Sequence, residues 1–234
     1  MKHAIAGDDF QTVEFSLDPN EFVVSEPGAM IYKTAGVALS SSFGGRQNKG
    51  LMGSVLGAGK RMLTGESWFV SYWKNETNQK QTVAFASSIP GKIVPIDLSR
   101  TDIVCRKDSF LCAASDVAIS VFFQKKVMTA LFGGAGFMMQ KLSGSGTAFI
   151  AAGGSYREFE LRPGERFQCD AGCLLAFESG VDFRLESAGS LKGALFGGEG
   201  LFFADFVGPG RVWVQSMPVV RLAAKMGTLL RTRR

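Results

Sequence analysis

Apolar and polar residues alternate along much of this chain, which is typical of β-strands that bury one face. The alternation is strict over residues 12–17 and 181–186. Turn residues such as the pair Pro163-Gly164 separate the alternating stretches. Further strand-like segments, rich in β-branched and aromatic residues, are 117–123, 147–150 and 212–215. Short strands at this spacing, with few helical stretches, predict an all-β protein built as a sandwich or a barrel-like body.

A glycine motif recurs along the chain. Residues 131–137 and 195–201 both read Leu-Phe-Gly-Gly-x-Gly followed by an apolar residue, and 63–69 is a weaker copy. A second pattern, at 17–31, returns at 161–175. Such repetition indicates one supersecondary unit that is used several times. We therefore predict one domain of three β-sandwich units around a pseudo-threefold axis, with units at 17–87, 98–152 and 161–216 and a basic tail at 219–234.

Two segments break the strand pattern. Residues 50–63 carry apolar residues at helical spacing, and they are predicted to form a short helix inserted in the first unit. In the tail, residues 219–230 place Leu222 and Met226 on one helix face and Lys225 elsewhere. We interpret this tail as a helix that packs at a subunit or domain edge. The alternative is a basic amphipathic helix that lies on an anionic membrane.

The glycine motif is interpreted as structural. Glycine occurs 29 times, and it lies in the repeats rather than in a low-complexity tract. This placement indicates backbone positions that need a positive φ or a close approach to a neighbouring strand, as we expect for Gly134 and Gly198. The motif residues are Gly65, Glu66, Gly133, Gly134, Gly136, Gly197, Gly198, Glu199 and Gly200.

Two acids of this motif are candidates for chemistry. Glu66 and Glu199 hold matching positions, and a pair of glutamates can act as acid and base or hold a metal ion. The matching residue of the middle unit is Ala135, so a cage of three carboxylates is excluded. We interpret both glutamates as turn caps that accept backbone N–H bonds. No catalytic residue, cofactor site or metal site is predicted.

The sequence lacks the residues that other kinds of catalytic site and metal site need. His3 is the single histidine, which excludes histidine-based triads and histidine metal sites. The glycine motif is followed by strand-like residues, so it does not match a phosphate-binding loop before a helix. The cysteines lack zinc-site spacing and are predicted to be small buried hydrophobic residues. They are Cys105, Cys112, Cys169 and Cys173.

The positive net charge of the chain indicates which kinds of partner it favours. The net charge is +5 and the isoelectric point is about 9.1, which favours an anionic partner such as a lipid surface or nucleic acid. Basic pairs at 60–61, 106–107 and 125–126 lie among 20 phenylalanines. Most of these phenylalanines alternate as core residues do, so nucleic-acid binding is disfavoured. No secretory signal and no transmembrane helix are evident. We therefore expect a cytoplasmic protein, and this expectation includes a location at the periphery of a membrane.

Several motifs taken in order resemble one family. They are residues 27–30, 65–69, 110–112, 161–165 with Asp170, 195–201, 208–210 and 213–215. Together they closely resemble a widespread bacterial family of unassigned function, which includes the mitochondrial proteins named altered inheritance of mitochondria, member twenty-four. The resemblance covers about residues 10–218. It implies a β-sandwich fold similar to the tryptophan RNA-binding attenuation protein, triplicated in one chain. It also implies, for the mitochondrial members, an association with inner-membrane organisation.

These observations lead to three hypotheses. The first is a non-enzymatic, oligomeric β scaffold that binds another protein or a membrane surface. The second is a module that binds nucleic acid or a small ligand, and the third is an enzyme that uses Glu66 and Glu199. We expect a homo-oligomer in which the tail or the 50–63 insertion contributes to the contact.

Overall fold

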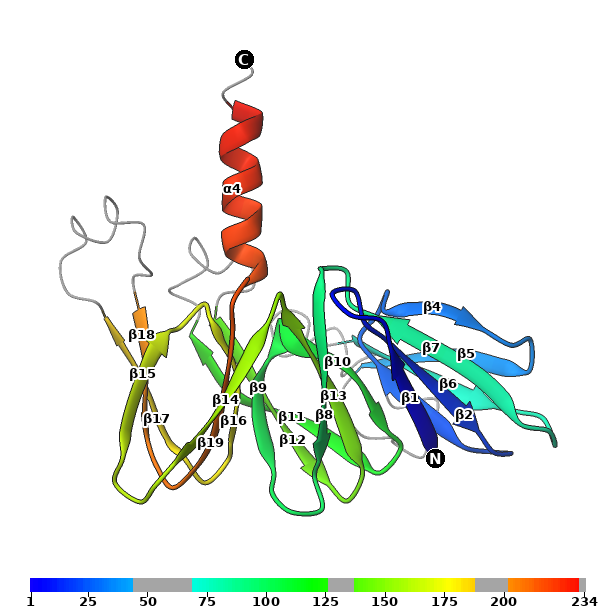
Figure 1. Ribbon diagram of the computed structural model, residues 1–234. Coiled ribbons are helices and arrows are strands. Elements are labelled where there is room, and N and C mark those ends of the chain that lie inside the picture. The colour runs from blue at the N-terminus through cyan, green and yellow to red at the C-terminus, as the bar shows by residue number, and fades with distance from the viewer. Residues whose placement is uncertain (44–68, 126–136, 188–201, 232–234) are drawn as a thin grey trace.

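The computed structural model of the protein describes residues 1–43, 69–125, 137–187 and 202–231 (Figure 1). These residues form antiparallel β-sheets, a short 3-10 turn and one C-terminal α-helix. The predicted all-β class is therefore confirmed. The predicted helix at 50–63 lies outside the described residues, as do Gly134 and Gly198.

Strands of similar length and order make up three units. Unit one follows the N-terminal strand β1 (Lys2–Ala6) and comprises β2 (Thr12–Leu17), β3 (Phe22–Ser25), β4 (Met30–Lys33), β5 (Val37–Phe43), β6 (Phe69–Asn75) and β7 (Gln81–Ala86). Unit two comprises β8 (Gly91–Asp97), β9 (Ile103–Arg106), the turn η1 (Lys107–Ser109), β10 (Phe110–Ala114), β11 (Val117–Lys125), β12 (Phe137–Gly144) and β13 (Thr147–Gly153). Unit three comprises β14 (Tyr156–Leu161), β15 (Arg166–Asp170), β16 (Leu174–Glu178), β17 (Asp182–Ser187), β18 (Phe202–Val207) and β19 (Gly210–Gln215), and the helix α4 (Val219–Arg231) follows.

Each unit splits its strands between two sheets in the same way. In unit one, β2, β7 and β4 are neighbours in one sheet, and β5, β6 and β3 are neighbours in another. The same order recurs as β8-β13-β10 with β11-β12-β9, and as β14-β19-β16 with β17-β18-β15. Alternation in the sequence produces this sandwich because each strand turns one set of side chains inward.

Neighbouring units are joined by strand pairing. The third strand of unit one, β3, pairs with β10 of unit two, and β9 of unit two pairs with β16 of unit three. Each pairing fuses two half-sheets into a six-stranded sheet. A closed threefold arrangement would need a third junction, between β15 and β4, and the described strands do not form it. The expected pseudo-threefold arrangement is therefore wrong for this structure, whose units stand side by side in an open row (Figure 1).

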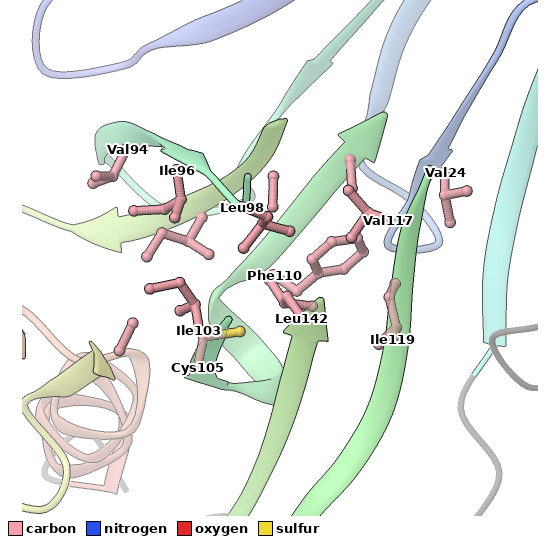
Figure 2. Packing of buried hydrophobic residues seen from close by; sticks show 14 of the residues in the cluster. Val24, Val94, Ile96, Leu98, Ile103, Cys105, Phe110, Val117, Ile119 and Leu142 are labelled. Atoms are coloured by element: carbon pink, nitrogen blue, oxygen red, sulfur yellow. The ribbon is translucent and has the colours of Figure 1, made fainter. Parts of the chain in front are cut away.

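The hydrophobic core is shared across the junctions. Phe15 and Phe85 of unit one pack in the same buried cluster as Phe149 of unit two. A second cluster combines Val24 of unit one with unit-two residues such as Phe110, as Figure 2 shows. Because a residue of the neighbouring unit completes each cluster, the units bury their apolar faces only as a row.

Backbone hydrogen bonds also link the points at which successive units begin. The residue at which a unit begins donates its backbone N–H to a carbonyl that adjoins the preceding unit. That carbonyl belongs to the residue just before the point at which the preceding unit begins. The bonds are Gly91 N to Asp9 O (2.6 Å), Gly154 N to Pro90 O (2.9 Å) and Met217 N to Gly153 O (3.0 Å). Met217 thus holds the place of a fourth unit start, and α4 begins where a further first strand would lie.

Candidate binding surfaces

The residues of the glycine motif, including Glu66 and Glu199, lie outside the described residues. Acids of a second repeated pattern are described, and they stabilise turns. The carboxylate of Glu21 accepts the backbone N–H of Asp18 at 2.8 Å. The matching Glu165 accepts the backbone N–H of Arg162 at 2.9 Å. These two acids therefore have a local structural role in units one and three.

Arg106 belongs to the basic pair at 106–107, a candidate for nucleic-acid binding. Its side chain is buried, and its Nε and Nη2 donate to the Asp108 carboxylate at 2.9 and 2.8 Å. A guanidinium engaged in this way is not presented to a phosphate. The side chains of the pairs at 60–61 and 125–126 are outside what the structure describes.

The four cysteines fall into two groups by burial. Cys105 and Cys112 are fully buried, as predicted, whereas Cys169 and Cys173 are half-buried. Burial raises the pKa of both Cys105 and Cys169 to about 12. At neutral pH these two thiols stay protonated and are weak nucleophiles. Within the described ranges, no group of three His, Cys, Asp or Glu side chains is placed to hold a metal ion.

A shallow hollow of about 310 Å³ lies where the unit starts meet. Its lining offers an amide, an ammonium, a hydroxyl and a phenol, from Gln11, Lys92, Ser155 and Tyr156. These groups do not form an acid–base pair of carboxylates, so the hollow gives no support to the hypothesis of a glutamate enzyme.

Glu26 is the acid with the most unusual environment among the described residues. It follows β3 at the junction of units one and two, where its backbone N–H donates to Leu111 O at 2.9 Å. Burial raises the pKa of this carboxyl to about 7; the negative charge of Asp108 adds to the rise and Lys107 opposes it. The shift follows from the position of Glu26 inside the junction, where a charge is poorly solvated.

The helix α4 is the most prominent exposed element. Figure 1 shows it, in red, standing away from the sheets. Its base is fixed by an ion pair between Arg221 and Asp170 of β15, with N and O 2.9 Å apart. Beyond this, Lys225 is exposed and Met226 is 56% exposed. The predicted helix is present, but within one chain it does not lie along a sheet. No described helix has the length and apolar composition needed to cross a bilayer.

Comparison with known proteins agrees with the family resemblance. A family model described as mitochondrial biogenesis AIM24 matches residues 3–217. A crystal structure of a Streptococcus pyogenes protein, determined by a structural genomics consortium, superposes with a TM-score of 0.77 and 25% sequence identity. The alignment covers 99% of both chains. A search of curated proteins gives no match.

Proposed function

The chain belongs to the mitochondrial biogenesis AIM24 family, and we propose that it is a non-enzymatic scaffold that assembles with copies of itself and binds an anionic membrane surface through α4. The exposed helix is the observation that carries this proposal. The helix projects from the sheets and, among the described residues, no element covers the apolar face on which Met226 is 56% exposed (Figure 1).

The composition of α4 matches an anionic surface. Its sequence contains Arg221, Lys225 and Arg231 and no acidic residue. Leu222 and Met226 are four positions apart and share one face, which suits shallow insertion among lipid headgroups. Each Lys or Arg near an anionic bilayer contributes about 1 kcal/mol of attraction. The net charge of the whole chain, +5, acts in the same direction.

Self-assembly would strengthen this binding. The helix spans 13 residues, which makes a single copy a weak anchor. Several copies held together bind one surface with a much higher overall affinity, because each later contact is intramolecular. In the proposed scaffold, the β-sheets therefore mediate assembly between copies, and α4 mediates contact with the membrane.

Nucleic acid is the less supported anionic partner. Arg106 of the 106–107 pair is buried against Asp108. A binding groove for a single strand needs exposed basic and aromatic side chains in sequence along one surface. The non-enzymatic part of the proposal rests on the sequence, in which a single histidine leaves few acid–base arrangements.

Vesicle co-sedimentation tests the proposal. We expect the protein to sediment with phosphatidylcholine vesicles that contain phosphatidylglycerol and not with phosphatidylcholine alone, and salt should weaken the binding. Lys225→Glu should reduce the affinity about tenfold or more, because it reverses one charge near the surface. Lys74→Glu, at an exposed position on β6, is the matched control and should bind as the unaltered protein does. Equal effects of the two variants, or no binding to anionic vesicles, would overturn the role of α4.

A further inference from the structure

Among the strands that the structure describes, two at the ends of the row lack a partner that their counterparts have. β10 and β16 each pair with a strand of the preceding unit, whereas β4 ends its sheet in unit one. Similarly, β3 and β9 each pair with a strand of the following unit, whereas β15 ends its sheet in unit three. An unpaired edge presents a row of backbone donors and acceptors that another strand can use.

Exposure at these edges shows what the missing neighbour would cover. Ile31 and Tyr32 of β4 are 48% and 50% exposed. Their counterparts in units two and three are at most 1% exposed; they are Leu111 and Cys112 of β10, and Leu175 and Ala176 of β16. The difference arises because only the latter two strands have a strand of the preceding unit beside them.

The outer face of unit three shows the same difference. Phe203 of β18 is 36% exposed. Its counterparts, Val70 of β6 and Met139 of β12, are 3% and 0% exposed because residues of the following unit pack on them. Unit three thus presents an aromatic side chain on the face that each earlier unit buries against its successor.

We propose that β15 of one molecule pairs with β4 of a second copy of this chain, head to tail, and so forms the junction that is absent within one molecule. The pairing is antiparallel, and Cys169 lies opposite Tyr32 and Gln168 opposite Lys33. This proposal deepens the oligomeric part of the proposed function, and it does not depend on membrane binding by α4.

The existing junctions set this register. Ser25 of β3 lies opposite Cys112, and Cys105 of β9 lies opposite Ala176. Ser25, Cys105 and Cys169 hold the same place in their units, opposite Ser71, Gln140 and Ala204. Tyr32, Cys112 and Ala176 also correspond, since they pair with Ala84, Phe149 and Trp213. Both internal junctions thus use one register, and its continuation brings Cys169 opposite Tyr32.

Head-to-tail contact has a consequence for the shape of the assembly. The two surfaces differ, so repeated contacts close into a ring if the rotation between copies permits and otherwise extend as a filament. Met217 and α4 already occupy the place where a following unit would begin. The second copy therefore joins through β4 and does not extend the series of backbone hydrogen bonds that links the beginnings of the units. The 72%-exposed Phe10 of the second copy, which is the counterpart of Met217, must then turn aside.

Cysteine cross-linking tests the register. Lys33→Cys and Gln168→Cys replace exposed side chains that lie opposite each other in this register. In a background with Cys169→Ser and Cys173→Ser, they should form an intermolecular disulfide when the protein is oxidised with copper phenanthroline. A ladder of multimers on a non-reducing gel is expected, and restoring Gln168 should abolish it. Tyr32→Cys with Gln168→Cys is the matched control: the Tyr32 side chain points to the opposite face of the strand, so this pair should give no ladder. The same yield from both pairs, or no ladder from either, would overturn the proposal.

Sedimentation velocity provides a second measurement that does not depend on thiol reactivity. The unaltered protein at micromolar concentration should sediment as species larger than its 25.1 kDa chain. A purely monomeric protein would overturn the pairing. A chain that ends at Met217 separates the two proposals, because it should lose vesicle binding and still give the ladder of the Lys33→Cys, Gln168→Cys variant. Loss of the ladder with vesicle binding intact in the full chain would reject the strand pairing alone.

Discussion

The half-buried carboxyl of Glu26 makes the stability of the protein depend on pH. Its pKa is about 7 in the folded chain, compared with an ordinary value of 4.5. In the folded state the proton is therefore held more tightly than in the unfolded state. The stability associated with this proton is fully present below pH 4.5, and it is lost as the pH rises toward and through 7. Glu26→Gln keeps the shape of the side chain and removes the titration.

The magnitude follows from the separation of the two pKa values. A difference of one pKa unit corresponds to about 1.4 kcal/mol, so full ionisation of Glu26 costs the folded state about 3 kcal/mol. Relative to the unaltered protein, Glu26→Gln should therefore gain about 3 kcal/mol in free energy of unfolding between pH 4.5 and pH 8. The gain should stop above the folded pKa, where Glu26 is ionised in both states.

Urea unfolding of both proteins at half-unit pH steps measures this difference. Comparing the two proteins cancels the titration of groups that do not interact with Glu26, and Glu160→Gln, at an exposed position on β14, controls for loss of a charge. Parallel stability curves for Glu26→Gln and the unaltered protein from pH 4.5 to 8 would refute the reasoning. A gain that appears only below pH 4.5 would show that the sign of the shift is wrong.

Two further substitutions test the packing of the units. Asn75→Ala should cost about 2–4 kcal/mol in urea unfolding, because the buried amide of Asn75 donates to Leu17 O at 3.0 Å and that carbonyl would lose its partner; a loss below about 0.5 kcal/mol would contradict this. Gly144→Ala should cost about 1–3 kcal/mol, since Gly144 has φ +133° and a Cβ there would lie 2.2 Å from Asp116 O. Gly180→Ala, with no atom within 4 Å of the added Cβ, should change the melting temperature little, and equal losses at both glycines would reject the steric explanation.

The all-β class could be predicted from the sequence because it depends on local patterns. Alternation over 12–17 matches β2, and the apolar spacing of 219–230 matches α4. The relation between units could not be predicted in this way. Repeats show that units are alike, but the pairing of β3 with β10 depends on contacts between segments far apart in the chain. The expected threefold closure assumed a curvature that the repeats do not encode.

The candidate sites were predictable to a smaller extent. Burial of Cys105 and Cys112 follows from their places in apolar strands. The unusual pKa of Glu26 was missed because it depends on Asp108, Lys107 and burial in the junction, none of which local spacing reveals. The roles of Glu66 and Glu199, and the likeness to the attenuation protein, stay predictions.

The sharing of core residues between neighbours has a consequence for how the molecule opens. A unit that detaches exposes both its own apolar cluster and part of the adjacent one, so nearest-neighbour coupling should be strong and folding should spread from one unit to the next. Unit two has two paired neighbours, whereas units one and three have one each. The free energy of local opening should therefore be greatest for amides in the middle of the row and fall toward both ends. Fraying, partial unfolding and proteolysis would then begin at the terminal units, where β4 and β15 lie.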